Sequence, residues 1–411
     1  MERKSNLLNI RLPFILPSLK VSHAAARSFP SEGESVTQEH PTSPRRAAAL
    51  IIAALLLMAA FALVAPYLSS AVRQGYDIFS GLTSSGSTTQ VSTTSQAGST
   101  NTSSALCSSV VSVRALAAPD IKNGSANVAY PPDYCTLAAF ALAQINADRA
   151  ANGTGPVSLD YNQAAQQHAD SMLYYGYFSH YDTQGYKPYM RYTLLGGLGA
   201  DYENVAFYGA QFRSTTAVED AVKSLEHLMV YNDSACCNNG HKFNILNPLH
   251  NQVSIGIAYN SNYVYFDEEF ENNYLNLNFS VTGPSASDPY YVTMTGTPTQ
   301  AVATPDSIYI AFDNTTVPET RAQLSNGPRE YGPGTLVGGI LPREPFLGTC
   351  AQFTAGTTVC ADTWKFTSSN VDIAFSLKEF VKNYGPGVYT VYLITGVSTS
   401  SALTTISIFV A

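Results

Sequence analysis

Residues 47–65 are nineteen consecutive residues without a charge, and no other feature of this chain constrains its fold as strongly. An α-helix rises about 1.5 Å per residue, so this run approaches the thickness of a bilayer's hydrocarbon core, about 30 Å. Arg45 and Arg46 precede the run, and the positive-inside rule places such a basic flank in the cytoplasm. The sequence therefore predicts a cytoplasmic tail over 1–46, a transmembrane signal anchor over 47–69 and extracellular domains beyond it. A cleavable signal peptide is the alternative, although 46 residues would make a long leader.

Charge and composition favour an exposed surface protein. The tail carries seven basic and four acidic residues, a net of +3, whereas the rest of the chain has a net charge of −11. Such an acidic region argues against a nucleic-acid partner. Residues 70–118 are rich in Ser and Thr and have too little apolar area to offset their ordering entropy, so we expect a flexible stalk. Asn-X-Ser/Thr motifs, which accept glycans in secreted proteins, occur on the predicted outer side at Asn101, Asn123, Asn152, Asn232, Asn278 and Asn314.

Three short clusters carry the residues best suited to chemistry. They are 178–180 (FSH), 202–206 (YENVA) and 240–248 (GHKFNILNP). Two histidines and a carboxylate could hold a metal ion with an open position, or transfer protons near neutral pH, if the fold brought them together. Their spacings of 23 and 38 residues match no local metal motif, so only tertiary structure can assemble them.

The order and context of these clusters resemble the CAP superfamily, which comprises cysteine-rich secretory proteins, antigen 5 and pathogenesis-related 1 proteins, in its prokaryotic or archaeal form. The resemblance covers about 134–274. It begins at 142–149 (LAQINADR), which is similar to the family's opening helix, and it closes at 253–259 (VSIGIAY), which is similar to the central strand. It implies a three-layer α-β-α sandwich, and we assign this domain to 119–285.

The resemblance also implies a cavity tetrad of two histidines and two acids. His180 matches the first histidine, Glu203 the first acid and His241 the second histidine. Glu226 lies about where many members place the second acid, and Asp233 is its rival. If a metal is held, His180 and His241 are its ligands, and zinc is the ion that two imidazoles and a water would favour.

Other polar residues of this region fit structural roles. His168 falls near the apolar face of a predicted helix, which indicates a hydrogen-bonded core histidine. Glu203 has the alternative role of a buried acid that anchors a loop through backbone N–H groups. The acidic run at 267–271 is expected to be a solvated edge next to the domain junction.

Six cysteines follow the apolar run, at positions 107, 135, 236, 237, 350 and 360. Cys350 and Cys360 enclose nine residues, which suggests a loop-closing disulfide. Cys135, at the start of the first CAP helix, could pair with Cys236 or Cys237. Spacing does not decide this, because six cysteines allow 15 connectivities. A cysteine-based zinc site is less favoured, since no CxxC spacing occurs and an extracytoplasmic setting promotes disulfides.

Residues 286–411 form a second region with a different texture. Runs such as 307–312 (SIYIAF) and 388–394 (VYTVYLI) are β-branched or aromatic and are bounded by Gly, Pro, Asn and Asp. Regular strands of this kind predict an immunoglobulin-like sandwich. The region has no histidine, so we expect a role in binding, spacing or packing.

The sequence thus predicts a membrane-anchored, extracytoplasmic CAP-domain protein with a His/Glu-lined cleft. The first hypothesis is binding of a peptide, lipid or surface-protein ligand, with metal support and no turnover. The second is a metal-assisted hydrolase that acts on envelope polymers. The third is a structural or adhesive surface protein. No GxSxG motif is present, which counts against covalent hydrolysis by a serine.

Overall fold

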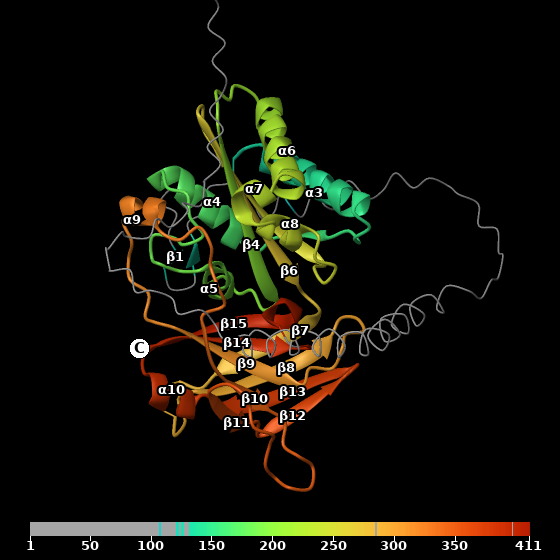
Figure 1. The fold of residues 1–411 in the computed structure, drawn as a ribbon, viewed down its shortest axis with the longest axis vertical. Helices are drawn as coiled ribbons and strands as arrows, with labels where there is room; N and C mark the ends of the chain where they lie inside the picture. Colours follow the sequence, from blue (N-terminus) through green and yellow to red (C-terminus); the bar gives the residue numbers. More distant parts are fainter. Residues whose placement is uncertain (1–106, 108–120, 123–124, 127–130, 284–285, 397) are drawn as a thin grey trace, which may run out of the picture. The chain divides into compact units, whose positions relative to one another are not determined.

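The computed structural model describes residues 131–283, 286–396 and 398–411, together with 107, 121–122 and 125–126. From residue 131 onward these residues lie in one compact unit (Figure 1). The predicted tail and anchor, most of the predicted stalk, and the acceptor sites Asn101 and Asn123 lie outside the described residues. Within the described part, no helix is both long and apolar enough to cross a bilayer. The acceptor asparagines inside it, Asn152, Asn232, Asn278 and Asn314, are all exposed.

The first part of the described chain is built on a four-stranded sheet with the order β3 (Ser158–Asp160), β5 (Gln252–Tyr259), β6 (Tyr263–Asn272) and β4 (Ala200–Gly209). β3 and β5 are parallel, whereas the other pairs are antiparallel. β6 is therefore an internal strand, and β4 lies at an edge of the sheet. A separate short pair, β1 (Ile121–Lys122) and β2 (Ser125–Ala126), precedes it.

Helices cover both faces of this sheet (Figure 1). They are α3 (Tyr134–Ala151) and α6 (Thr215–Tyr231) on one face and α4 (Ala164–Tyr175) on the other, followed by α5 (Pro188–Leu194), α7 (Ser234–Cys237) and α8 (Gly240–Ile245). Ile255 and Ile257 share a hydrophobic core with α3 and α6. Ala258 shares a second core with Met172 of α4. Strands covered on both faces are commonly rich in apolar and small residues, and β5 follows this pattern.

Gly256 sets how closely α4 approaches β5. A Cβ at this position would lie 2.1 Å from the backbone oxygen of Ala165, an atom that cannot move without displacing the helix. We expect Gly256→Ala to lower the free energy of unfolding by about 3 kcal/mol, because overpacking against a rigid backbone is costly. Urea unfolding followed by circular dichroism measures this.

Gly155→Ala is the matched control, since a Cβ there would meet no atom within 4 Å. A stability of Gly256→Ala equal to that of the control would contradict the close packing of α4.

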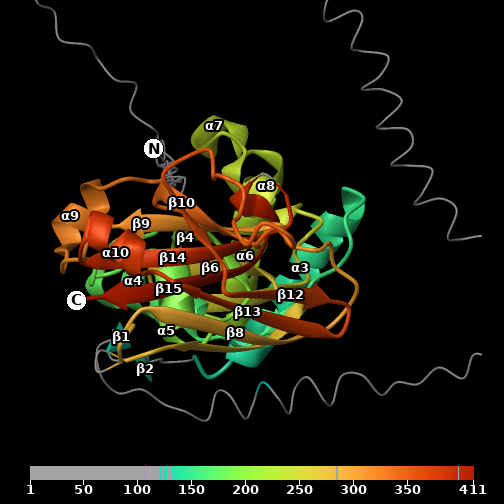
Figure 2. The ribbon, with the colours of Figure 1, turned by 90° about the horizontal axis from the view of Figure 1, so that it is seen from below.

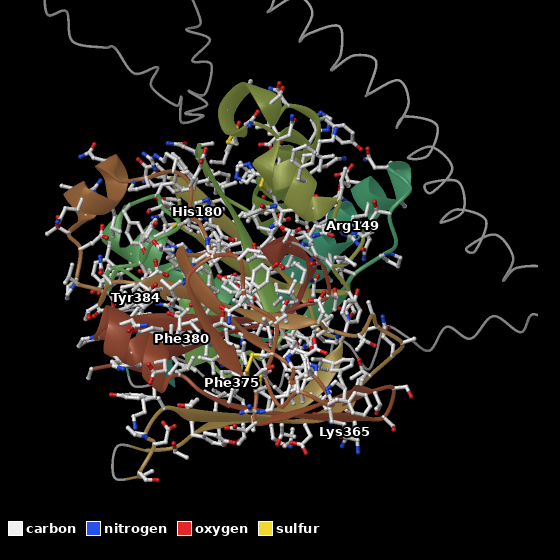
Figure 3. All side chains as sticks on the ribbon, turned by 60° about the horizontal axis from the view of Figure 1, so that its bottom comes forward. Arg149, His180, Lys365, Phe375, Phe380 and Tyr384 are labelled. Carbon is white, nitrogen blue, oxygen red and sulfur yellow. A yellow bond between two sulfur atoms is a disulfide. The ribbon has the colours of Figure 1, made fainter. Side chains whose placement is uncertain are left out.

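Two further sheets make up the rest of the described chain. One has the order β12 (Thr363–Thr367), β13 (Asn370–Ser376), β8 (Tyr291–Pro298), β7 (Leu275–Val281), and the other has the order β11 (Thr357–Cys360), β10 (Thr335–Leu341), β9 (Ser307–Asp313), β14 (Gly387–Ile394), β15 (Ala402–Val410). The helices are α9 (Arg321–Asn326), α10 (Lys378–Tyr384) and the 3-10 turn η1 (Thr399–Ser401). One core joins the two sheets and includes Phe375 and Phe380 (Figure 3).

This pair of sheets differs from the expectation in two respects. β7 pairs with β8 along its whole length, so 275–281 lie on the far side of the boundary that the sequence placed after residue 285. The strand pair β10–β11 is parallel, whereas the pairs within the other sheet are antiparallel. The immunoglobulin-like class stays a prediction.

Strand β15 packs against α5, β4 and β6 of the first part of the chain. Seen from below, the sheets of the second part lie in front of the first part (Figure 2). The Asn272 side chain donates to the carbonyl of Ala402 at 2.8 Å, and the Tyr202 hydroxyl donates to the carbonyl of Thr399 at 2.6 Å. Ala200 and Ala402 also share a small apolar core. These contacts hold the start of β4 and the end of β6 against the second pair of sheets.

The described cysteines form three disulfides, Cys107–Cys135, Cys236–Cys237 and Cys350–Cys360. The last is the predicted pair, but the predicted bond from Cys135 to one of the adjacent cysteines is wrong. Thr215 at the start of α6 donates to Asp133 beside the start of α3. Tyr231 at the end of α6 donates to Asp148 near the end of α3. The two helices are therefore parallel, and the adjacent cysteines follow the end of the pair that lies far from Cys135.

Candidate ligand-binding cleft

A cavity of about 700 Å³ runs along the edge strand β4. Consecutive residues of β4, 201–207, form one wall. The other walls come from α6, from the segment that contains α7 and α8, and from 329–333, which lies between α9 and β10. His180, Glu203 and His241 all line this cavity, so the fold brings together three of the four residues predicted for the tetrad.

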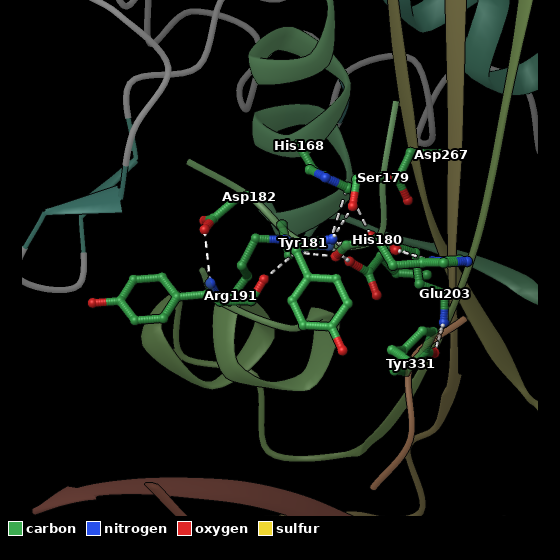
Figure 4. A network of polar contacts seen from close by, with 12 residues as sticks. His168, Ser179, His180, Tyr181, Asp182, Arg191, Glu203, Asp267 and Tyr331 are labelled. Atoms are coloured by element: carbon green, nitrogen blue, oxygen red, sulfur yellow. Dashed lines mark hydrogen bonds and ion pairs between the residues drawn. The ribbon is translucent and has the colours of Figure 1, made fainter. Parts of the chain in front are cut away.

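Glu203 is fully buried and holds the first histidine in place (Figure 4). Its Oε2 lies 2.6 Å from Nδ1 of His180, and its Oε1 contacts Arg191. Burial acts to raise the pKa of Glu203, but Arg191 and the neighbouring histidines outweigh it and hold this pKa well below its ordinary value. An ionised carboxylate only accepts hydrogen bonds, so Nδ1 of His180 carries the hydrogen. Nε2 is the ring nitrogen left to meet a ligand.

The second histidine has its own carboxylate. Nδ1 of His241 lies 2.7 Å from Oδ1 of Asp233, which is buried, and Oδ2 of Asp233 accepts the backbone N–H of Lys242 at 3.1 Å. Glu226 is also buried, but it bonds to Glu268 on the sheet. Of the two candidates for the second acid, Asp233 is therefore the one that contacts a cleft histidine.

The loop that follows His241 is fixed from beneath by a buried cation. Arg149, which is 1% exposed, donates to the carbonyl of Asn247 and to that of His250, both at 3.1 Å. Arg149 is the last residue of the 142–149 motif, and this contact explains why an arginine stands there. The motif shapes the cleft without lining it.

Arg191 is the central cation of the site and is fully buried. It donates to the carbonyl oxygens of His180 at 2.9 Å and Tyr186 at 3.0 Å, and it lies 3.7 Å from Glu269. Burial acts to lower the pKa of Arg191, but the surrounding carboxylates, Glu203 first, raise it above its ordinary value. This guanidinium is the only Arg or Lys partner of Glu203 in the described part of the chain.

His168 lies behind this site. Its Nδ1 is 2.8 Å from Glu203 and 3.0 Å from Asp267, and the side chain is fully buried. Burial, with the charge of Arg191, lowers the pKa of His168 to about 4, so the ring is neutral at pH 7. The prediction of a hydrogen-bonded core histidine is confirmed.

The acidic run at 267–271 is not a solvated edge, and that prediction was wrong. Asp267, Glu268, Glu269 and Glu271 are each 0% exposed, because β6 is an internal strand with helices over both faces. Carboxyl groups pair with one another there, Glu268 with Glu226 and Glu269 with Asp201. Burial raises the pKa of Glu268 to about 7, and burial with the charge of Glu203 does the same for Glu269.

Protons shared within these carboxyl pairs explain buried oxygen atoms that otherwise have no hydrogen-bond partner. Both side-chain oxygens of Glu226, Asp201 and Glu269 lack hydrogen-bond donors when the carboxyl groups are ionised. A proton on one member of each pair supplies that donor, as expected for two carboxylates forced together in a buried site. The sequence contained the acids but no sign that they would face one another.

Tyr331 is a cleft residue that sequence reasoning missed. Its hydroxyl accepts the backbone N–H of Glu203 at 2.7 Å, and its ring centre lies 4.9 Å from that of His180 (Figure 4). Arg329 places its guanidinium 5.6 Å from the centre of the Phe178 ring. Residues 327–334 (GPREYGPG) bracket one tyrosine with Gly and Pro, which indicates an ordered loop, but nothing local shows that it returns to β4.

The donor atoms can be compared with those of known metal sites. Each cleft histidine bonds a carboxylate through Nδ1, which is how metal-binding histidines are commonly oriented. Two clusters of three or more potential ligands occur in the described residues, Asp233 with Cys236, Cys237 and His241, and His168 with Glu203 and Asp267. Neither contains both His180 and His241. The second already holds the guanidinium of Arg191, which leaves little need for another cation.

Two comparisons with known proteins found matches to part of this chain. Residues 142–279 match the model of the cysteine-rich secretory protein family, CAP. Similar solved structures include an extracellular protein containing an SCP domain from Bacillus anthracis, at 21% identity over 32% of this chain and 40% of that one, with a TM-score of 0.24. They also include the CAP domain of Enterococcal PrgA, at 13% identity over 32% of this chain and 58% of that one, with a TM-score of 0.23. The chain thus spans less than two thirds of either structure. A search of the curated proteins found no match.

Proposed function

We propose that residues 142–279, a domain of the cysteine-rich secretory protein (CAP) family, bind an extended peptide ligand in the cleft along β4. The observation that carries this proposal is the cavity itself, whose volume of about 700 Å³ lies within the range of ligand sites. It follows an edge strand, and exposed strand edges are common docking places for extended peptides.

The cleft offers a peptide both apolar and polar contacts. Phe243, which is 70% exposed, stands at the rim, and Leu228 and Met229 line the wall from α6. The Nε2 atoms of His180 and His241 add directional hydrogen bonding. Exposed aromatic residues beside a few oriented polar groups are typical of recognition sites.

Glu203 supports binding more than turnover. A general base works best when its pKa lies near the working pH. The carboxylate of Glu203 is instead held far below that range by Arg191 and His168, and both of its oxygens already accept from other groups. Its role in this proposal is to orient His180, and it does so through side-chain partners and not through the backbone N–H groups expected of a loop anchor.

The test begins with full-length protein and a random decapeptide library displayed on phage. Selected peptides are synthesised, and their affinity is measured by fluorescence anisotropy. We expect Phe243→Asp and His180→Ala to weaken binding at least tenfold, or about 1.4 kcal/mol. Phe346→Asp is the matched control, because Phe346 is 99% exposed and does not line the cleft. Failure to select peptides, or equal affinity in all three variants, would overturn the proposal.

Metal-assisted hydrolysis is the second candidate, favoured by the two histidine–carboxylate pairs. His180 and His241 would hold a zinc ion, which would supply an activated water. Calorimetric titration with Zn²⁺ that saturates in wild type and fails in His180→Ala and His241→Ala would support it. Cleavage of the selected peptides, detected by mass spectrometry and lost in both variants, would move the assignment from binding to hydrolysis.

The proposed setting is the outer face of a cell membrane, with 47–69 as the anchor and the cleft displayed outside. The support comes from the charge difference across that segment and from the exposure of the described acceptor asparagines. When protease is added to intact cells, we expect it to digest the C-terminal part of the protein and to leave the N-terminal tail intact.

A further inference from the structure

Four potential metal ligands of different kinds gather within nine residues at the wall of the cleft. Asp233, Cys236, Cys237 and His241 each offer one ligand atom, and these atoms all lie within 4.8 Å of one another. All four residues line the cavity. In the structure the two cysteines are joined to each other.

The backbone explains why these residues converge. Helix α7 is followed by Asn238 and Asn239, whose φ angles of 51° and 64° are left-handed. Two such residues in succession turn the chain back on itself, and asparagine tolerates this conformation better than most residues. The turn returns His241, in the first turn of α8, to Asp233, which precedes α7. Cys236 remains close, with Sγ 3.6 Å from Oδ1 of Asp233.

We propose that this segment is a redox-gated metal site that binds Zn²⁺ when the two cysteines are reduced. Two thiolates, one imidazole nitrogen and one carboxylate oxygen are a donor set that zinc accepts, and the thiolates select for it over Mg²⁺ or Ca²⁺. Oxidation removes the site, because the sulfurs of a disulfide are no longer thiolates. The site shares His241 with the zinc site of the second candidate function but does not use His180, so the two sites are alternatives.

The chemistry balances with a dithiol as the reductant. The dithiol gives two electrons and two protons to the Cys236–Cys237 bond, which breaks to two thiols while the reductant closes its own disulfide. Zinc then binds the two thiolates, and the thiol protons pass to solvent. The proposal does not depend on what the cleft binds, although the change in the cleft wall would reach any ligand there.

The experiment uses full-length protein reduced under argon with a water-soluble phosphine, which takes up the oxygen of one water as the thiols form. Co²⁺ is titrated as the spectroscopic probe, and Zn²⁺ is then added. We expect one Co²⁺ per chain with thiolate-to-cobalt charge-transfer absorption, displaced by Zn²⁺. The oxidised protein should show no such absorption.

Variants separate this site from its alternatives. Cys236→Ser and Cys237→Ser should lose the charge-transfer absorption, with thermal unfolding as the check on folding. A double variant with Cys350→Ser and Cys360→Ser should keep it, as should His180→Ala. Reduced wild type that shows no thiolate-to-cobalt absorption, or absorption that survives in Cys236→Ser with Cys237→Ser, would overturn the proposal. Co²⁺ binding that shows no thiolate absorption and is lost in His180→Ala would overturn it as well and would assign the metal to the two cleft histidines.

Discussion

The free energy of unfolding should fall as the pH rises from about 6.5 to about 9. The cause is the group of buried carboxyls on β6 and their partners. The folded pKa values of Glu268 and Glu269 are raised to about 7, in both cases chiefly by burial. Those of Glu226 and Asp201 are raised well above the ordinary value, by burial and by the carboxyl each one faces.

The direction of this change in stability depends on whether folding favours the protonated or the ionised form of each group. A carboxyl whose pKa is raised on folding contributes stability that is fully present below its unfolded pKa, about 4.3, and is lost as the pH rises through the folded value. The buried histidines have the opposite effect on stability, and they have it at lower pH. Burial lowers the pKa of His168 to about 4 and that of His250 to about 3, so their contribution is present above the unfolded pKa and is lost as the pH falls. Above about pH 6.5 only the carboxyl effect remains.

Urea unfolding at several pH values across this window measures the slope. A carboxyl contributes on the order of 1.4 kcal/mol per pH unit while it is protonated in the folded chain and ionised in the unfolded chain. For Glu268 and Glu269 this slope therefore fades above about pH 7, and Glu226 and Asp201 carry it further. In Glu226→Gln the amide can donate to Glu268 without a titrating proton, so we expect a shallower slope. Glu379→Gln is the control, since the side chain of Glu379 is 55% exposed and its slope should match wild type. A stability that stays level or rises across the window would show that the carboxyl pairs hold no proton.

Arg191→Met should lower the free energy of unfolding by about 3–5 kcal/mol, the cost of removing one partner of a buried ion pair. Methionine fills much of the same space, but it leaves Glu203 ionised and buried without its cation. The carbonyl oxygens of His180 and Tyr186 would also lose their donor. The stability of Arg191→Lys should lie between those of wild type and Arg191→Met, because lysine restores the charge but not the planar array of guanidinium donors.

The matched control is Arg343→Met. Arg343 pairs with Asp362 at 3.1 Å, but both side chains are about half exposed, so the expected loss is below about 1 kcal/mol. Thermal and urea unfolding compare the variants. If Arg191→Met costs no more than Arg343→Met, the buried network does not depend on this guanidinium.

The short motifs were the parts of the sequence from which site residues could be predicted. His180, Glu203 and His241 stand in motifs that resemble those of one family, and the fold places all three on one cavity. The disulfide between Cys350 and Cys360 was also predicted correctly from the sequence, because a bond across so short a loop depends on local chain geometry. His168 was identifiable as a core residue from its helical position.

The residues that the sequence did not reveal depend on strand order or on distant segments. Whether 267–271 face solvent depends on whether β6 is an edge or an internal strand, and an acidic run carries no such information. The choice of Asp233 over Glu226 depends on a turn through two left-handed asparagines. Tyr331 reaches Glu203 across 128 positions of the chain.

The amino-acid sequence by itself therefore determined the resemblance of 142–279 to one family, the three principal cleft residues and the β-rich character of the region that follows. Tertiary structure alone decided which carboxylate orients His241, which acids share protons and which loop closes the cleft. The physical reason is the distance along the sequence over which each feature is specified. Motifs and short loops are specified by neighbouring residues, whereas burial, carboxyl pairing and cleft walls arise only when distant strands and helices exclude water together.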